Sequence, residues 1–351
     1  MNDNILAVKK CALCGGEAPL VFKDMSGYVE GTKYNVYECQ SCLSSFVDPM
    51  SNLQEEYDVI YGKDLSEQNT ENKEAVYNYY YFLAKGVKQL KNPLKSLSEY
   101  TAIYWGALKA LKDNNVNIGD SVLEVGSGLG YFTHALNKAG YKAHGVEYSE
   151  TATNFAKKYF GDFYTCGNIE EYAKTHKEQY DVVIATEVIE HVENPISFIG
   201  AFLEVLKPGG KIIITTPNKD VHPRGTIWET DHAPKHLWWF TEKGLKAIAQ
   251  NFNKDFYCVD FTDYKKNKLY NIPIGVAFEA PNREPIAGKD GTTLSKKSIS
   301  YKERLMHILP PSLYIRIVGI YHNFTWFRKS KEENGSMCLI FMNVQIVMLV
   351  S

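Results

Sequence analysis

Long apolar runs are scarce in this sequence. The longest, residues 337–350, is interrupted by Asn343 and Gln345, whereas a membrane-spanning helix needs about 20 consecutive apolar residues. The first ten residues also lack an apolar stretch of the length found in signal peptides. We therefore expect no transmembrane helix, a cytoplasmic protein and reduced thiols.

An excess of charge of either sign is also missing. The chain has 39 Lys and Arg against 41 Asp and Glu, for a formal net charge of −2. This balance argues against a protein built to neutralise many phosphates, so we expect no nucleic-acid partner. With 44% hydrophobic and 23% charged residues, the composition excludes disordered, collagen-like and coiled-coil classes. The 351 residues suffice for one large domain with appendages or for two to three smaller ones.

Four of the seven cysteines form two C-x-x-C pairs, Cys11 with Cys14 and Cys39 with Cys42. Each pair directs two sulfurs at one metal, and two pairs close a tetrahedral site of the structural zinc type. Together with the alternating segment 34–37, this predicts a zinc ribbon over residues 1–50. Iron in a rubredoxin-like site is the main alternative, and two disulfides fit a reducing compartment poorly. Four protein ligands leave no open position, so this metal should be catalytically silent.

Residues 51–115 have the composition and spacing of a helical connector. Asn92-Pro93 breaks the run, and a second helix is expected over 97–112. The tyrosines at 79–81 are candidates for substrate contact, but aromatic residues at such spacing more often belong to a core.

A strand at 121–125 leads into the turn 126–130, of sequence Gly-Ser-Gly-Leu-Gly, and then into a helical pattern from Tyr131. Glycines let backbone approach a ligand, and a helix N-terminus favours anionic groups. The third glycine comes one residue too early for a dinucleotide fingerprint. A second strand, 142–147, ends in an acid that could accept both ribose hydroxyls of a nucleoside.

Further strands at 180–185 and 211–216, separated by a helix, continue a β/α alternation. The fold class predicted is α/β, with a doubly wound, mostly parallel, seven-stranded Rossmann-like sheet. The zinc ribbon and the helical connector precede this sheet.

Over residues 116–263 this order of motifs resembles class I S-adenosylmethionine-dependent methyltransferases. The resemblance implies that the methionine part of S-adenosylmethionine is surrounded by Gly126, Ser127, Gly128 and Gly130. It also implies that Glu124 holds the amino group, that Glu147 binds the ribose, and that Asn168 and Ile169 flank the adenine.

The fourth strand runs into Glu187-Val-Ile-Glu190-His191, which on a helical turn would share one face. This motif resembles metal-dependent branches of the family, namely ubiquinone-pathway O-methyltransferases and small-RNA 2′-O-methyltransferases. The resemblance implies one divalent cation, Mg or Mn among the choices, on Glu187, Glu190, His191 and His236. Two alternatives stay open: a histidine acts as a metal-free general base, or the cluster is structural.

The C-terminal part is predicted to hold a strand at 255–262, an insertion or lid at 264–335, and a final antiparallel strand and tail at 336–351, with the strand at 336–342. Residues 283–331 carry ten Lys and Arg against three Asp and Glu. Such a segment could cover an anionic substrate or lie on a membrane surface, but we expect a solvated helical flap.

Taken together, these features resemble methyltransferases of bacterial surface-polysaccharide and secondary-metabolite pathways. The resemblance implies methyl transfer to a hydroxyl of a sugar, sugar nucleotide or related small metabolite. Three alternatives stay open: C- or N-methylation of a deoxysugar or secondary metabolite, RNA 2′-O-methylation, and a non-catalytic zinc-bearing scaffold.

Overall fold

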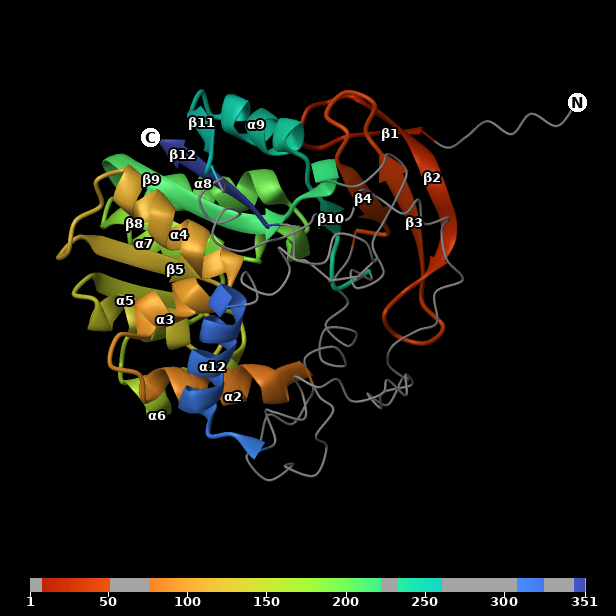
Figure 1. Cartoon of the computed structure of the whole chain (residues 1–351). Coiled ribbons are helices and arrows are strands. Elements are labelled where there is room, and N and C mark those ends of the chain that lie inside the picture. The colour runs from red at the N-terminus through yellow and green to blue at the C-terminus, as the bar shows by residue number, and fades with distance from the viewer. Residues whose placement is uncertain (1–7, 51–75, 222–232, 261–307, 325–343, 351) are drawn as a thin grey trace, which may run out of the picture.

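The computed structural model describes residues 8–50, 76–221, 233–260, 308–324 and 344–350. Their strands form two sheets, one of seven strands and one of five. Figure 1 shows the N-terminal strands at one side of the molecule, with β10 next to them and the large sheet beyond. Residues 51–75 and most of the predicted insertion fall outside the described residues.

The large sheet has the parallel, doubly wound core that the sequence predicts. Its strands are, in spatial order, β11 (Asp255–Cys258), β12 (Val344–Val350), β9 (Leu206–Pro217), β8 (Tyr180–Thr186), β5 (Ser121–Val125), β6 (Lys142–Glu147) and β7 (Tyr164–Cys166). The five strands from β9 to β7 pair in parallel, and β12 pairs antiparallel with both β9 and β11. Among the five parallel strands, chain order therefore runs outward from β5 in both directions, and β12 inserts between β9 and β11.

The last strand differs from its predicted position. The strand that pairs with β9 is Val344–Val350, whereas the predicted 336–342 lies outside the described residues. Apolar residues extend over nearly all of 337–350, so hydropathy alone could not fix the ends of the strand. The preceding strand is also shorter than the predicted 255–262. It begins at Asp255 and ends at Cys258.

Helices cover both faces of the sheet because successive strand residues point to opposite sides. In β8, Val182 and Ile184 belong to one buried cluster, and Val183 and Ala185 to the other. The first cluster includes side chains of α2 (Val76–Lys88), α3 (Pro93–Tyr100), α4 (Ala102–Asp113), α5 (Tyr131–Lys138), α6 (Glu150–Phe160) and α12 (Pro311–Phe324). The second includes side chains of α7 (Ile169–Thr175), α8 (Pro195–Val205) and α9 (Glu242–Asn251).

The connector confirms the predicted break but not the predicted helix over 97–112. Helix α3 begins at Pro93 and ends at Tyr100, and Thr101 then caps α4 by accepting a hydrogen bond from the backbone N–H of Tyr104 at 3.4 Å. Threonine is a favoured N-cap residue, which explains the interruption. Tyr81 packs against Phe155 with ring centroids 4.8 Å apart, as expected of a core residue.

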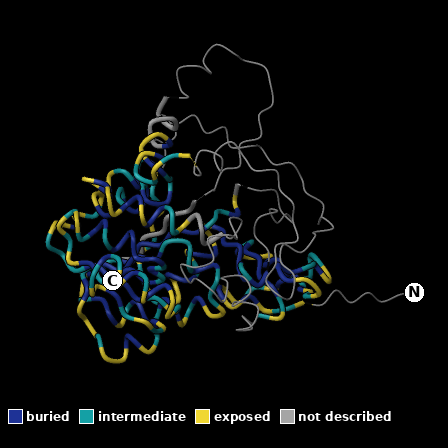
Figure 2. The backbone as a smooth tube through the Cα atoms, turned by 90° about the horizontal axis from the view of Figure 1, so that it is seen from below, coloured by how far each residue is buried: buried dark blue, intermediate teal, exposed yellow. Residues whose placement is uncertain are grey.

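The N-terminal module consists of β1 (Val8–Lys10), β2 (Glu17–Ser26), β3 (Lys33–Glu38) and β4 (Ser45–Asp48), all antiparallel. The strand β10 (Trp238–Trp239) joins its edge by pairing with β4. Buried residues of the module, Cys11 and Phe46 among them, lie in the same cluster as one face of the large sheet. In Figure 2 the buried backbone accordingly extends from the region of the large sheet toward the N-terminal part.

Candidate active site and metal centres

The three glycines after β5 all adopt positive φ, but for different purposes. A Cβ on Gly126 would lie 2.5 Å from the side chain of Val188, and one on Gly130 would lie 2.7 Å from the ring of Tyr164. Packing therefore requires a residue without a side chain at these two positions. Gly128 has φ +50°, and a Cβ added there would have no neighbouring atom within 4 Å, so the middle of the turn is open to a ligand.

Glu147, the last residue of β6, is brought onto this turn. Its Oε2 accepts a hydrogen bond from the backbone N–H of Gly128 at 2.7 Å, and its Oε1 accepts one from Ser149 at 2.8 Å. Burial raises the pKa of Glu147, against the effect of these backbone hydrogen bonds. The predicted ribose-binding acid and the predicted cofactor turn thus form one site.

Glu124 lies beneath the turn and is only 2% exposed. The hydroxyl of Thr133 donates a hydrogen bond to its carboxyl group, and burial raises the pKa of Glu124 to about 8. The hydroxyl of Ser127 is buried without a hydrogen-bond partner in the described part of the chain. Both groups are enclosed beneath the turn, and a Cβ on Gly145 would lie 2.7 Å from the Oγ of Ser127.

The two predicted adenine neighbours have local structural roles. Asn168 caps α7 by accepting a hydrogen bond from the backbone N–H of Glu171 at 3.0 Å, and Ile169 is 3% exposed in the core. Sequence reasoning missed Tyr148, which follows Glu147 and is 62% exposed. An aromatic residue directly after Glu147 was the signal available in the sequence.

The segment after β8 does not form the helical turn that was expected. It contains a short 3-10 helix, η1 (Ile189–His191), and Glu187 adopts φ +56°. The carboxylates of this segment are held by the neighbouring strand: Thr215 donates to Glu187 at 2.8 Å, and Thr216 donates to Glu190 at 2.9 Å.

Three of the four predicted cation ligands come together. Glu190, His191 and His236 each offer a ligand atom within 4.8 Å of the others, and Glu187 is not part of this group. The Nε2 of His191 lies 3.8 Å from Oε1 of Glu190, and the rings of His191 and His236 are 4.7 Å apart at 82°. Burial, and then the charges of Glu187 and Glu190, raise the pKa of Tyr80 in α2.

A hydrogen bond of Nδ1 fixes the orientation of the His191 ring. Its Nδ1 is bonded to the carbonyl oxygen of Lys235, so Nδ1 carries a proton. Metal-ligating histidines show this arrangement. Burial, and then the charge of His236, lower the pKa of His191 well below its usual value. Two imidazoles and a carboxylate fit a divalent cation with open positions for a substrate.

The four cysteines of the N-terminal module also converge. Cys11 Sγ lies 3.8 Å from Cys42 Sγ, and Cys14 Sγ lies 3.4 Å from Cys39 Sγ. Tetrahedral zinc with bonds of about 2.3 Å to sulfur requires separations of roughly 3.8 Å. Without a cation, burial raises the pKa of Cys14 to about 11. The donor set therefore fits a zinc ion, which would favour the thiolate forms.

The cofactor turn and the Glu–His cluster follow adjacent strands. The turn comes after β5, and Glu190 and His191 of the cluster come after β8; the chain order reverses between these two strands. In open α/β sheets, ligands bind outside the carboxyl ends of the strands at such a reversal. The close approach of Gly126 to Val188 shows that the two loops are in contact.

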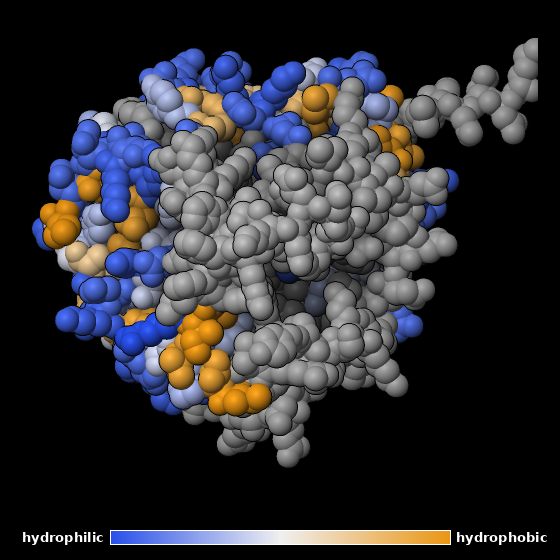
Figure 3. Space-filling model, viewed as in Figure 1, coloured by the Kyte–Doolittle hydropathy of each residue, from blue (hydrophilic) through white to orange (hydrophobic). Residues whose placement is uncertain are grey.

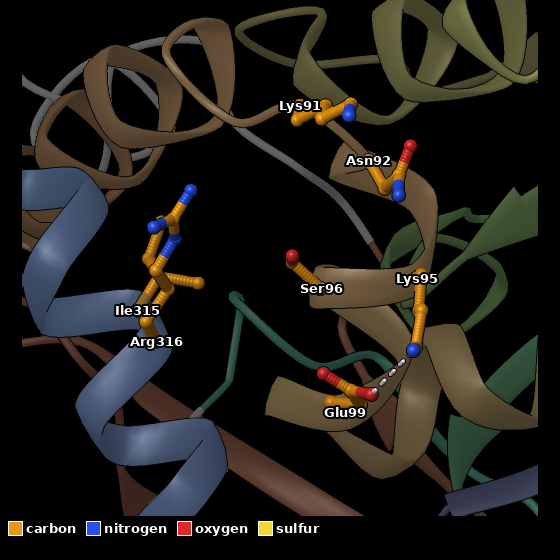
Figure 4. A pocket seen from close by; sticks show the side chains of 7 residues that line it. All are labelled: Lys91, Asn92, Lys95, Ser96, Glu99, Ile315 and Arg316. Carbon is orange, nitrogen blue, oxygen red and sulfur yellow. Dashed lines mark ion pairs between the residues drawn. The ribbon is translucent and has the colours of Figure 1, made fainter.

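One further pocket lies away from this region, between α3 and α12. It has a volume of about 280 Å³ and is lined by Lys91, Asn92, Lys95, Ser96, Glu99, Ile315 and Arg316. Figure 4 shows these side chains around it, with Lys95 paired to Glu99 at 3.8 Å. Nearby, α12 and the segment preceding it expose Ile308, Leu313 and Ile317, and Figure 3 shows apolar side chains over this part of the surface. Surface contact with a membrane remains a prediction.

Among the described helices, none is both long and apolar enough to cross a membrane.

A family model described as a methyltransferase domain matches residues 77–258. The chain belongs to this methyltransferase family. Its large sheet has the parallel, doubly wound core that the sequence predicts for this family. The match begins in α2, so it includes the connector helices as well as the parallel sheet.

Two curated relatives of this methyltransferase are named ubiquinone biosynthesis O-methyltransferase. The protein from Hydrogenovibrio crunogenus is 35% identical over 105 residues, covering 28% of this chain and 44% of the relative. The protein from Shewanella sp. is 32% identical over 166 residues, covering 44% of this chain and 70% of the relative. The chain thus spans less than half the length of the first of these relatives.

Among solved structures, a SAM-dependent methyltransferase from Archaeoglobus fulgidus aligns over 70% of this chain and 93% of its own. Its sequence identity is 16% and its TM-score 0.39.

Proposed function

We propose that this methyltransferase transfers the methyl group of S-adenosylmethionine to a hydroxyl group of a small molecule. The observation that carries the proposal is the contact of Gly126, the first residue of the glycine turn, with Val188 in the loop that carries Glu190 and His191, at the strand-order reversal. One loop would hold the methyl donor, and the neighbouring loop would hold the acceptor.

The cofactor would be held by groups from both sides of the turn. Gly128 offers open backbone, Glu147 offers a carboxylate for the ribose hydroxyls, and Glu124 with the hydroxyl of Ser127 would meet the polar methionine part. Tyr148, exposed directly after Glu147, provides an aromatic face for a base. The predicted contacts of Asn168 and Ile169 with adenine would use their backbone, since the side chain of the first caps a helix and that of the second is buried.

In this proposal Glu190, His191 and His236 bind one divalent cation, Mg or Mn. When bound, such a cation lowers the pKa of a coordinated hydroxyl and aligns its oxygen with the methyl group. Thr216 and the carbonyl of Lys235 would fix the orientation of Glu190 and His191. The four cysteines would hold a structural zinc ion.

The acceptor would carry two adjacent hydroxyls, because a cation with open positions can bind both and select one for reaction. Sugars and sugar nucleotides have this feature, and a carbohydrate-like acceptor remains the sequence-based proposal. The names of the curated relatives support hydroxyl methylation in general. A test panel should therefore include vicinal diols of sugars and of aromatic rings.

The test uses S-adenosylmethionine labelled with ¹³C in its methyl group, with the acceptor panel and the full chain. The ¹³C chemical shift of the product methyl distinguishes attachment to oxygen, nitrogen or carbon. Methylation of carbon or nitrogen would overturn the hydroxyl assignment. Methylation of RNA oligonucleotides alone would replace the small-molecule acceptor.

The role of the cluster is tested by Glu190→Gln and His236→Asn, each against Glu193→Gln as a matched control. Glu193 is exposed on the same loop and is outside the cluster. We expect turnover to fall by about 10²-fold or more in the first two variants while S-adenosylhomocysteine affinity is kept. The control should retain both.

Chelation separates a cation from a metal-free base. With zinc content measured to show that the cysteine site stays loaded, a chelator should abolish turnover, and added Mg or Mn should restore it. If turnover survives chelation but the His236 variant is inactive, the general-base alternative replaces the cation. If neither variant loses turnover, the cluster is structural.

A further inference from the structure

Residues 233–241 lie between the N-terminal module and the Glu–His cluster. On the module side, the backbone N–H of Tyr28 donates to the carbonyl of Ala233 at 2.6 Å, and that of Val47 donates to Leu237 at 3.1 Å. The strand β10 then pairs with β4, with Trp238 opposite Phe46. The segment therefore supplies an edge strand to the module, although it lies almost 200 residues after β4 in the sequence.

The other side of the same segment is bonded to the active-site loop. The backbone N–H of Leu237 donates to the carbonyl of Glu190 at 2.8 Å, and the indole N–H of Trp238 donates to the carbonyl of Val192 at 3.1 Å. The Nδ1 of His191 is bonded to the carbonyl of Lys235. His236 sits between these attachments and is 6% exposed.

The cysteine turns are attached to this segment directly. The hydroxyl of Thr241 donates to the carbonyl of Cys42, and its backbone N–H donates to the hydroxyl of Ser44 at 3.1 Å. Next to Cys39, the carboxylate of Glu38 pairs with Lys219 at 2.7 Å, and both side chains are at most 5% exposed. Lys219 also donates from its backbone to Phe240 at 2.9 Å.

From these contacts we infer that the four-cysteine module is a positioning element of the reaction centre. Its strand β4 sets the place of His236 relative to Glu190 and His191, and the metal held by the four cysteines keeps β4 in place. This inference rests on the proposed function for the role of His236. It gives the cysteine metal an indirect part in methyl transfer, although that metal has no open position for a substrate.

The cofactor site has no comparable attachment to the module among the described residues. Its turn and its ribose acid come from β5 and β6, and they are bonded to each other and to Ser149. Disturbing β4 should therefore displace His236 while leaving S-adenosylhomocysteine binding nearly unchanged. A module that merely stabilised the whole chain would affect both sites together.

The main test variant is Phe46→Ala, which removes the ring that packs against Trp238 at 5.3 Å. Its matched control is Phe22→Ala, the same truncation on β2, which is separated from β10 by β3 and β4. A second variant, Cys39→Ser, removes one sulfur of the metal site. All three are made in the full chain.

The readout is carbethoxylation of histidines by diethyl pyrocarbonate, followed residue by residue with mass spectrometry, with His134 of α5 as internal reference. Zinc content and S-adenosylhomocysteine affinity are measured on the same samples. In Phe46→Ala and in Cys39→Ser, we expect the reaction rate of His236 to rise about five-fold or more by local opening. The rate at His134 and, to within about two-fold, the affinity should stay as in the wild type.

Unchanged protection of His236 in both Phe46→Ala and Cys39→Ser would overturn the inference. So would a rise at His134 and a loss of affinity in parallel with His236, or an equal rise at His236 in Phe22→Ala. The readout does not require methyl transfer. If His236 responds as expected but Glu190→Gln and His236→Asn keep full turnover, the module still positions His236, but the role that the proposed function gives to the cluster in methyl transfer fails.

Discussion

Glu124 shows how one buried carboxyl group can depend on a ligand. It is 2% exposed, and burial raises its pKa to about 8 even though Thr133 donates a hydrogen bond to it. At neutral pH the group therefore holds its proton in the cofactor-free protein. An ammonium group at this place would favour the carboxylate, because an opposite charge stabilises the ionised form.

The raised pKa of Glu124 predicts a particular pH dependence of stability. Below about pH 4.5 the folded and unfolded states are both protonated at this residue, and its stabilising contribution is fully present. As pH rises toward 8, only the unfolded state releases the proton. The free energy of unfolding therefore falls, by at most about 1.4 kcal/mol for each pH unit. Glu124→Gln should therefore melt higher than the wild type at pH 8, with a difference that shrinks toward pH 5.

Thermal melting of the cofactor-free protein at pH 5, 6.5 and 8 measures this difference. Glu204→Gln is the control, because the Glu204 side chain is 52% exposed and should show no such trend. Parallel pH profiles for the wild type and Glu124→Gln would contradict a raised pKa at this residue.

At the scale of elements, the glycine turn between β5 and α5 combines two requirements. Its first and third glycines allow close packing against Val188 and Tyr164, whereas Gly128 faces open space. The same element thus joins strand to helix and leaves room for a ligand. A substitution at each glycine should separate these requirements.

Gly128→Ala should weaken cofactor binding without preventing folding. A Cβ there meets no protein atom but would occupy the side open to the ligand, and the positive φ costs about 1–2 kcal/mol. Gly119→Ala is the matched control, since Gly119 also has positive φ and open space but lies before β5. Calorimetry with S-adenosylhomocysteine should show lower affinity only for Gly128→Ala. Equal affinity in both variants would place the cofactor elsewhere.

At the scale of the molecule, the N-terminal module and the methyltransferase sheet share one core and one buried ion pair. The side chains of Lys219 and Glu38 are 3% and 5% exposed, and Lys219 also donates to the carbonyl of Leu43 at 2.8 Å. Removing one partner of such a pair leaves an uncompensated buried charge. A partly exposed ion pair in the same chain offers a comparison.

Lys219→Met should lower the free energy of unfolding by about 3–5 kcal/mol. Lys207→Met is the control, because the side chains of Lys207 and Asp181 are 41% and 35% exposed and exposed pairs contribute about 0–1 kcal/mol. Denaturant titration followed by circular dichroism gives both values. Similar small losses in the two variants would show that the buried pair of Lys219 and Glu38 contributes little to stability.

The sequence by itself determined the elements whose signals are local. The two C-x-x-C pairs, the alternation of strand and helix, and the turn 126–130 followed by an acid at Glu147 are set by spacing along the chain, and spacing is visible in one dimension. The break at Pro93 is local in the same sense, because proline begins a helix more readily than it continues one. The apolar run 337–350 is longer than the strand within it, so the sequence could not fix where that strand begins and ends.

Only the tertiary structure decided which distant groups meet. Glu187, Glu190 and His191 were expected on one helical face, but Thr215 and Thr216 of the neighbouring strand hold the two carboxylates separately, and Glu187 is left out of the cluster. The attachment of β10 to β4 depends on two backbone edges and on the fit of Trp238 against Phe46. Neither edge pairing nor packing leaves a periodic pattern in the sequence, because both depend on how separate segments are oriented in space.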